Sequence, residues 1–274
     1  MKTQSISVII LSILCVSLLW FSASTWQEKV RNAGGHTARN AEIPQSPLVE
    51  NEAPVKKASP VQYMSTTDLL KIGASLDDKT LEVVISRAEA GKHVQMLIVG
   101  SEAIAAAAER FATVISDKYG GLIGVDVATF DMTSTRFVAE ALEAGKIEWE
   151  AGYDIVLYEP FTLHNNGEVV IENERKDLLA VKALAESYVE DVSFLVTPPQ
   201  PIYRAGYYLT QIQALKKFTS ARGIPYINHW PNWPDTRSDE LLTYIDETRM
   251  PTESGIKAWS DALIAYFVDE KFVK

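Results

Sequence analysis

Short, unbroken apolar runs alternate with longer amphipathic segments over most of the chain. Apolar runs without polar alternation are typical of strands that are buried on both faces of a sheet. The longer segments repeat apolar residues every three or four positions, which predicts helices, and glycines or capping residues separate the two kinds of segment. We therefore expect strands at residues 94–99, 122–129, 153–158, 192–196 and 225–228.

Helices are expected between these strands. They are predicted at residues 75–90, 102–118, 133–144, 173–188, 207–222, 238–246 and 254–267, and residues 65–68 can cap a further short helix. A regular alternation of strand and helix implies a parallel sheet with helices on both sides. The sequence thus predicts an α/β fold, a flavodoxin-like three-layer αβα sandwich with a five-stranded parallel sheet, in one domain over residues 65–274.

The N-terminus has a different pattern, because residues 6–23 are almost wholly apolar. This run approaches the ~20 residues that span a bilayer and exceeds the ~7–15 of a secretory core region. The small residues at 22–24 offer a cleavage site. Residues 1–25 are therefore expected to form a transmembrane signal anchor or a cleaved signal peptide, and the proline-containing residues 26–64 a flexible linker. The folded domain would then lie outside the cytoplasm, attached to the membrane or secreted.

Composition narrows the range of ligands. The 274-residue chain has a net charge of -10 and no basic stretch, so nucleic acid is not an expected partner. Its one cysteine, Cys15, lies in the apolar run, so the domain has no disulfide and no cysteine metal site. Neither G-x-G-x-x-G, a Walker loop nor H-E-x-x-H occurs, and we expect no cofactor and no metal.

The first predicted strand leads into Gly100-Ser101-Glu102 at the start of a helix. Ligands of parallel α/β proteins bind at the carboxyl ends of the strands, and hydrolases often present a serine nucleophile at such a turn. Serine is also among the best helix N-caps, so its position alone leaves both roles of Ser101 open. Glu102 can interact with the helix dipole or act as a base or hydrogen-bonding group in the cleft.

The loop after the third strand holds His164, Asn165 and Asn166. Side-chain amides at this edge could stabilise an oxyanion, although Asn-Asn-Gly is also a good turn in its own right.

His229, Trp230 and Trp233 follow the last predicted strand. His229 could be a base or contact a sugar, or it could be a hydrogen-bonded structural histidine. The two indole rings could form a stacking platform for a sugar or belong to the core.

Several segments together resemble the SGNH/GDSL hydrolase superfamily, most closely its membrane-anchored Gram-positive members. The resemblance covers about residues 94–267 and is carried by the Gly-Ser turn, YDIVLYEPFTLHNNG at 153–167, TPPQPIYRAGYYLTQIQALKKF at 197–218, PYINHWPNWPD at 225–235 and MPTESGIKAW at 250–259. It implies an α/β ester hydrolase with a serine nucleophile.

The family's catalytic motifs are altered in this chain. Where the family has Gly-Asp-Ser, an ungapped alignment puts Ser101 at the aspartate and Glu102 at the nucleophile, and a one-residue shift makes Ser101 the nucleophile. Gly120 or Gly121 would be the second-block glycine, and Asn165 or Asn166 the third-block asparagine. The final Asp-x-x-His-Pro falls on residues 247–251, where Glu replaces Asp and Met replaces His.

Two functions follow. In the first, the protein hydrolyses an O-acyl ester on a cell-envelope glycan: Ser101 attacks, His229 or His164 takes its proton, Glu247 or Asp246 orients the base, and Asn165 with a backbone N–H holds the oxyanion. In the second, the protein is catalytically degenerate and binds surface polysaccharide or an envelope-assembly partner. The missing histidine of the last motif favours the second function.

Overall fold

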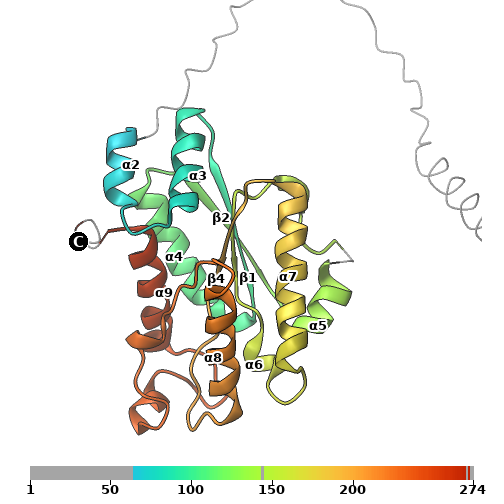
Figure 1. Ribbon diagram of the computed structural model, residues 1–274. Helices are drawn as coiled ribbons and strands as arrows, with labels where there is room; N and C mark the ends of the chain where they lie inside the picture. The colour runs from blue at the N-terminus through green and yellow to red at the C-terminus, as the bar shows by residue number, and fades with distance from the viewer. Residues whose placement is uncertain (1–63, 143–144, 270, 272–274) are drawn as a thin grey trace, which may run out of the picture. The chain divides into compact units, whose positions relative to one another are not determined.

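A parallel sheet of four strands organises the domain. The computed structural model describes residues 64–142, 145–269 and 271. The strands are β1 (Val94–Gly100), β2 (Ile123–Thr129), β3 (Ile155–Tyr158) and β4 (Ser193–Val196). They lie in the order β2-β1-β3-β4, and every neighbouring pair is parallel (Figure 1). The predicted α/β class is therefore confirmed.

The helices cover both faces of this sheet. They are α2 (Thr66–Ile72), α3 (Asp78–Glu89), α4 (Ala105–Lys118), α5 (Ser134–Arg136), α6 (Thr162–Asn165), α7 (Ile171–Tyr188), α8 (Tyr207–Ser220) and α9 (Glu253–Phe267). Single 3₁₀ turns occupy Glu102–Ile104, Trp149–Ala151, Trp230–Asn232 and Asp239–Thr243, and a π-helical turn continues α5 over Phe137–Leu142.

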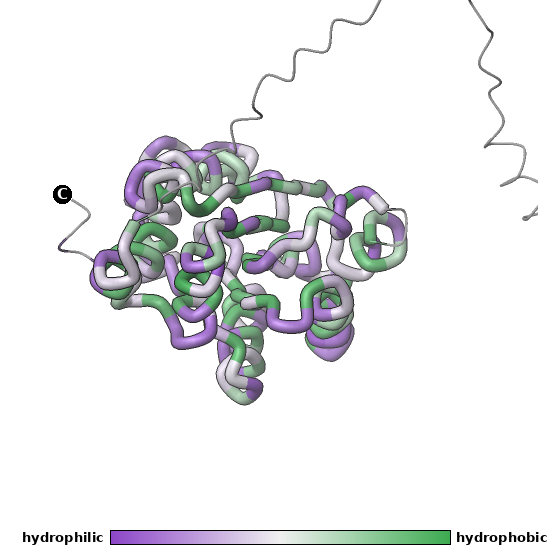
Figure 2. The backbone as a smooth tube through the Cα atoms, turned by 90° about the horizontal axis from the view of Figure 1, so that it is seen from above, coloured by the Kyte–Doolittle hydropathy of each residue, from purple (hydrophilic) through white to green (hydrophobic). Residues whose placement is uncertain are grey.

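Two hydrophobic cores lie on opposite faces of the sheet, because successive strand side chains point to opposite sides. Met96 and Ile98 of β1 face the core shared with α2, α3, α4 and α9. Leu97 and Val99 face the core shared with α7, α8 and the turn after α5. Figure 1 shows α4 and α9 on one side of the sheet and α5 and α7 on the other, so the domain has three layers. In Figure 2 the helices carry both hydrophobic and hydrophilic stretches, as expected for helices with one buried side.

The predicted fifth strand is wrong. Residues 225–228 make only an isolated parallel bridge, Val196 with Tyr226. Pro225 has no N–H to donate, although its carbonyl accepts from the N–H of Val196 at 2.9 Å. After the N–H of Ile227 has bonded the Val196 carbonyl at 2.8 Å, the chain turns into the 3₁₀ turn at Trp230.

The predicted transmembrane helix and linker lie outside the described residues. Within the part of the chain that the structure describes, no helix is both long and apolar enough to cross a membrane.

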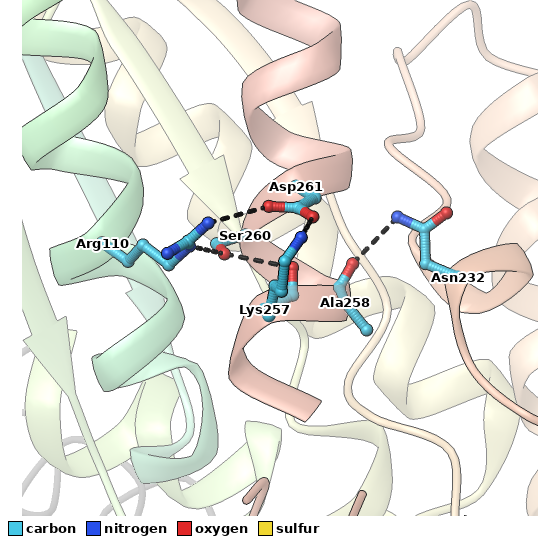
Figure 3. A network of polar contacts seen from close by, with 6 residues as sticks. All are labelled: Arg110, Asn232, Lys257, Ala258, Ser260 and Asp261. Atoms are coloured by element: carbon cyan, nitrogen blue, oxygen red, sulfur yellow. Dashed lines mark hydrogen bonds and ion pairs between the residues drawn. The ribbon is translucent and has the colours of Figure 1, made fainter. Parts of the chain in front are cut away.

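Helices α4 and α9 pack against each other beside the sheet. Phe111 and Phe267 meet edge to face with their ring centroids 5.1 Å apart, and the Tyr119 hydroxyl donates to the Phe267 carbonyl at 2.5 Å. On the outside of this contact, the Arg110 guanidinium donates to the Ser260 hydroxyl at 2.9 Å and to Asp261 at 3.1 Å (Figure 3). The polar contacts align the two helices, while the apolar contacts supply most of the stabilisation.

The first turn of α9 depends on Gly255, because a Cβ there would lie 2.7 Å from the Trp233 ring and would overlap the Tyr244 carbonyl. We expect Gly255→Ala to lower the free energy of unfolding by about 1–3 kcal/mol through overpacking, measured by urea denaturation. Gly124→Ala is the control, since the atom nearest its new Cβ would be 3.6 Å away. Equal free energies of unfolding in the two variants would contradict the close packing of Gly255 against Trp233 and Tyr244.

Candidate active site

The carboxyl ends of β1 and β3 border a pocket of about 380 Å³, which we call the strand-end pocket. Its lining combines five segments that are distant in sequence: the segments that follow each of the four strands, and the segment of the altered last motif. The lining residues are Glu102, Ala103, Asp131, Leu163, His164, Gln200, Thr248, Arg249 and Met250. The turn after β1, the loop after β3 and the altered last motif therefore meet at one edge of the sheet.

A buried carboxyl group, that of Glu159 at the end of β3, lies behind this pocket. One of its oxygens accepts from the N–H of Ser101 at 2.7 Å, and the other accepts from the N–H of Phe161 at 2.8 Å. Burial raises the pKa of Glu159, while hydrogen bonds from the side chain and backbone of Ser101 oppose this rise. Gly100 permits the approach, because a Cβ there would lie 2.7 Å from the Cβ of Glu159.

Ser101 turns toward Glu159 and does not line the pocket. It is only 2% exposed, and its side chain makes no capping hydrogen bond to the helix that follows. The side-chain capping interpretation is therefore wrong. The exposed residue that lines the pocket at this turn is Glu102. At its β1 edge the pocket thus presents a carboxylate and not the serine.

His164 lines the strand-end pocket, paired with Asp131. Its Nε2 lies 3.0 Å from Oδ1 of Asp131, and both residues belong to the pocket lining. Its Nδ1 is buried and has no hydrogen-bond partner among the described residues. This histidine–aspartate pair lies at the edge of the sheet where the sequence predicts the chemistry.

His229 is a structural histidine. It is fully buried and stacks on Trp259, with centroids 4.3 Å apart and planes 9° apart. The Trp233 indole N–H donates to its Nδ1 at 2.8 Å, so the ring proton is on Nε2, which donates to the Pro198 carbonyl at 2.8 Å. Burial lowers the pKa of His229 to about 3. With both nitrogens engaged, the ring has none left to receive the proton of Ser101, which contradicts the predicted role of His229 as base.

Asn165 is fully buried, and both the oxygen and the nitrogen of its side-chain amide are hydrogen-bonded within the domain. Its Oδ1 accepts from the N–H of Ser134 at 2.9 Å, and its Nδ2 donates to Glu174 at 3.0 Å and to the Pro160 carbonyl at 3.3 Å. No donor remains for an oxyanion, which contradicts that predicted role. Asn166 is exposed at the end of α6 and lies outside the strand-end pocket.

Two other predicted residues also lie outside the pocket. Gly121 precedes the amino end of β2, at the opposite edge of the sheet, where its φ of 77° makes a left-handed turn. Glu247 is exposed, and its neighbours Thr248, Arg249 and Met250 line the pocket instead. The physical reason is the turn at Asp246, whose carboxylate accepts from the N–H groups of Thr248 and Met250 at 2.8 and 3.0 Å.

Sequence reasoning missed Arg249 and Gln200. Arg249 adopts a left-handed φ of 68°, and its carbonyl accepts from the Gln200 amide at 2.9 Å. The Oε1 of Gln200 is buried and has no partner among the described residues. An arginine in a left-handed turn leaves no sequence signal, because the preference for this backbone region belongs to glycine and asparagine.

Comparisons with known proteins find similar structures but no similar sequences. No family model and no curated protein matches the sequence. Among solved structures, TesA matches with a TM-score of 0.51 and 11% identity, over 65% of this chain and 99% of its own. The domain has the SGNH hydrolase fold.

Two further structures share this SGNH fold. A catalytic mutant of Axe2, an acetylxylan esterase from Geobacillus stearothermophilus, has a TM-score of 0.50 and 10% identity, over 66% of this chain and 96% of its own. LAE5, an alpha/beta hydrolase enzyme from the metagenome of Lake Arreo in Spain, has a TM-score of 0.50 and 9% identity, over 64% of this chain and 94% of its own. At these identities the likeness concerns the fold alone.

The domain also contains a second buried carboxyl group, that of Glu174, whose ionised form is disfavoured by burial. Glu174 accepts from the Thr162 hydroxyl at 2.8 Å and from Asn165, and burial raises its pKa from 4.5 to about 7. Between these pH values the folded protein binds more protons than the unfolded chain does. Its free energy of unfolding therefore falls as the pH rises from 4.5 to 7.

We expect Glu174→Gln to remove this contribution, because a neutral amide can still accept from Asn165 and donate to the Thr162 hydroxyl. Between pH 4.5 and 8 the free energy of unfolding should fall by roughly 3 kcal/mol more in the wild type than in the variant. Urea denaturation across this range measures the difference. If the difference in free energy of unfolding between the two proteins did not change with pH, the raised pKa would not belong to Glu174. Glu159 is present in both proteins, so its own titration does not contribute to this difference.

Proposed function

We propose that this SGNH-fold domain binds a glycan in the strand-end pocket and does not hydrolyse esters through a serine–histidine relay. One observation carries the proposal. Glu102 and Met250 line the pocket, and the ungapped alignment puts them at the serine and histidine of the resembling hydrolases, while Ser101 is only 2% exposed and does not line it. Removing a base from such a relay typically costs several orders of magnitude in rate.

The chemistry of the pocket supports a hydroxyl-rich ligand. Glu102 and Asp131 accept hydrogen bonds, Arg249 donates them, and His164 can do either. This mixture suits sugar hydroxyls, which both donate and accept. Axe2, which shares the fold, is an acetylxylan esterase, and this also points to a glycan as the class of ligand. The apolar N-terminal run supports a cell-envelope glycan, met outside the cytoplasm by a membrane-anchored or secreted protein.

An O-acyl esterase is the second candidate, and the pair of His164 with Asp131 favours it. In this alternative the Ser101 hydroxyl would turn from Glu159 toward the pocket and transfer its proton to His164. The two functions make opposite predictions for ester hydrolysis.

We expect the purified protein to hydrolyse p-nitrophenyl acetate no faster than Ser101→Ala or His164→Ala, because the Ser101 hydroxyl bonds the buried Glu159 and no histidine among the described residues bonds it. Initial rates followed by absorbance test this, with the uncatalysed rate subtracted. If the rate of hydrolysis fell about 100-fold or more in both variants, the protein would be an esterase and the binding proposal would be wrong.

We further expect Glu102→Gln to weaken glycan binding about tenfold, since hydrogen bonds to a charged group contribute about 1.5–3 kcal/mol. Arrays of cell-envelope polysaccharides, followed by calorimetry on those that bind, supply the measurement. Glu109→Gln is the matched control, being an exposed glutamate on α4 that does not line the pocket. Unaltered affinity in Glu102→Gln would place the ligand elsewhere.

A further inference from the structure

A second pocket, of about 530 Å³, lies between α8 and residues 226–236, and we call it the indole pocket. It shares no lining residue with the strand-end pocket. Its lining includes Ile212, Gln213, Lys216, Asn228, Trp230 and Asp235. None of these side chains contributes to the strand-end pocket.

The half-buried Trp230 gives this pocket a rigid aromatic wall. Its indole N–H donates to the Pro199 carbonyl at 2.8 Å, and its ring lies 6.0 Å from that of the buried Tyr208. The turn that carries it is tied to α9 by the Asn232 amide, which donates to the Ala258 carbonyl at 3.0 Å (Figure 3). Since the N–H is already used, the ring offers the pocket its apolar surface, held in place before any ligand binds.

Trp233, predicted to stack on a sugar as well, is only 7% exposed. Its N–H is bonded to His229, and its ring packs against Tyr244 and the Gly255 backbone. Trp233 is therefore a core residue that supports the pocket, and the stacking role falls to Trp230 alone.

The rim of the indole pocket carries unused hydrogen-bonding groups. Gln213 and Lys216 are exposed, and their spacing puts them on one side of α8. Neither side chain has a hydrogen-bond or ion-pair partner in the part of the chain that the structure describes. Asn228 uses its oxygen to accept from the N–H of Trp230 at 3.4 Å, which leaves its amide hydrogens for a ligand.

We propose that the indole pocket binds one neutral sugar ring, whose C–H face packs on Trp230 and whose hydroxyls bond to Gln213, Lys216 and Asn228. An apolar wall with a few convergent polar groups is typical of a small-molecule site. The lining carries one carboxylate, Asp235, and one ammonium group, Lys216, so its formal charge is balanced and suits an uncharged ligand. The choice of ligand class rests on the proposed function, but the site itself does not depend on the strand-end pocket.

The test is calorimetric titration of the full-length protein with cellotriose, xylotriose and chitotriose. We expect at least one of them to bind, with affinity reduced about tenfold or more in Trp230→Ala and partly retained in Trp230→Phe. Lys216→Ala should weaken binding about three- to tenfold, and Lys217→Ala, an exposed neighbour outside the pocket, should not. Thermal unfolding of each variant separates lost binding from lost folding, and the Lys216 variant perturbs no packed contact.

Absence of binding by all three sugars would overturn the proposal, as would unchanged affinity in both Trp230→Ala and Lys216→Ala. Glu102→Gln separates the two sites. Binding that falls in Glu102→Gln but not in Trp230→Ala supports the strand-end pocket and refutes the indole pocket. Binding that falls in Trp230→Ala but not in Glu102→Gln refutes glycan binding at the strand-end pocket and supports the indole pocket.

Discussion

The burial of the Glu159 carboxyl against the turn after β1 is the contact on which the candidate active site depends. A carboxyl group removed from water must be hydrogen-bonded or neutral, and this one receives bonds from Ser101 and from the N–H of Phe161. The approach requires glycine at position 100. Phe161, which bonds the second oxygen, has a left-handed φ of 59° and precedes α6, the helix that carries His164 to the pocket.

Two of the residues expected to act in the pocket are instead used to hold the fold together. The histidine that sequence reasoning favoured is committed elsewhere, because both of its nitrogens hold the segment after β4 and Trp233 together. The asparagine expected to stabilise an oxyanion is likewise committed to Glu174 and to the backbone of Ser134. Both residues contribute to the architecture around the pocket, and its polar lining comes from other residues: Glu102, Asp131, His164, Gln200, Thr248 and Arg249.

The proline-rich segment after β4 separates the two pockets. Its prolines cannot donate hydrogen bonds, so side chains bind its carbonyls: His229 bonds that of Pro198, and Trp230 bonds that of Pro199. Gln200 then lines the strand-end pocket, while Pro201 lines the indole pocket.

The sequence by itself determined the layer architecture and the edge of the sheet where the motifs meet, because apolar runs, helical periodicity and glycine stops are local properties. The strands β1 to β4 and the helices α4, α7, α8 and α9 lie close to their predicted ranges. Only the tertiary structure decided which polar residues face the pocket. Ser101 and Glu102 are adjacent in sequence, and their orientation depends on Glu159, which is 58 positions from Ser101. The burial of His229 depends on Trp259 in another helix, and no local pattern encodes such a contact.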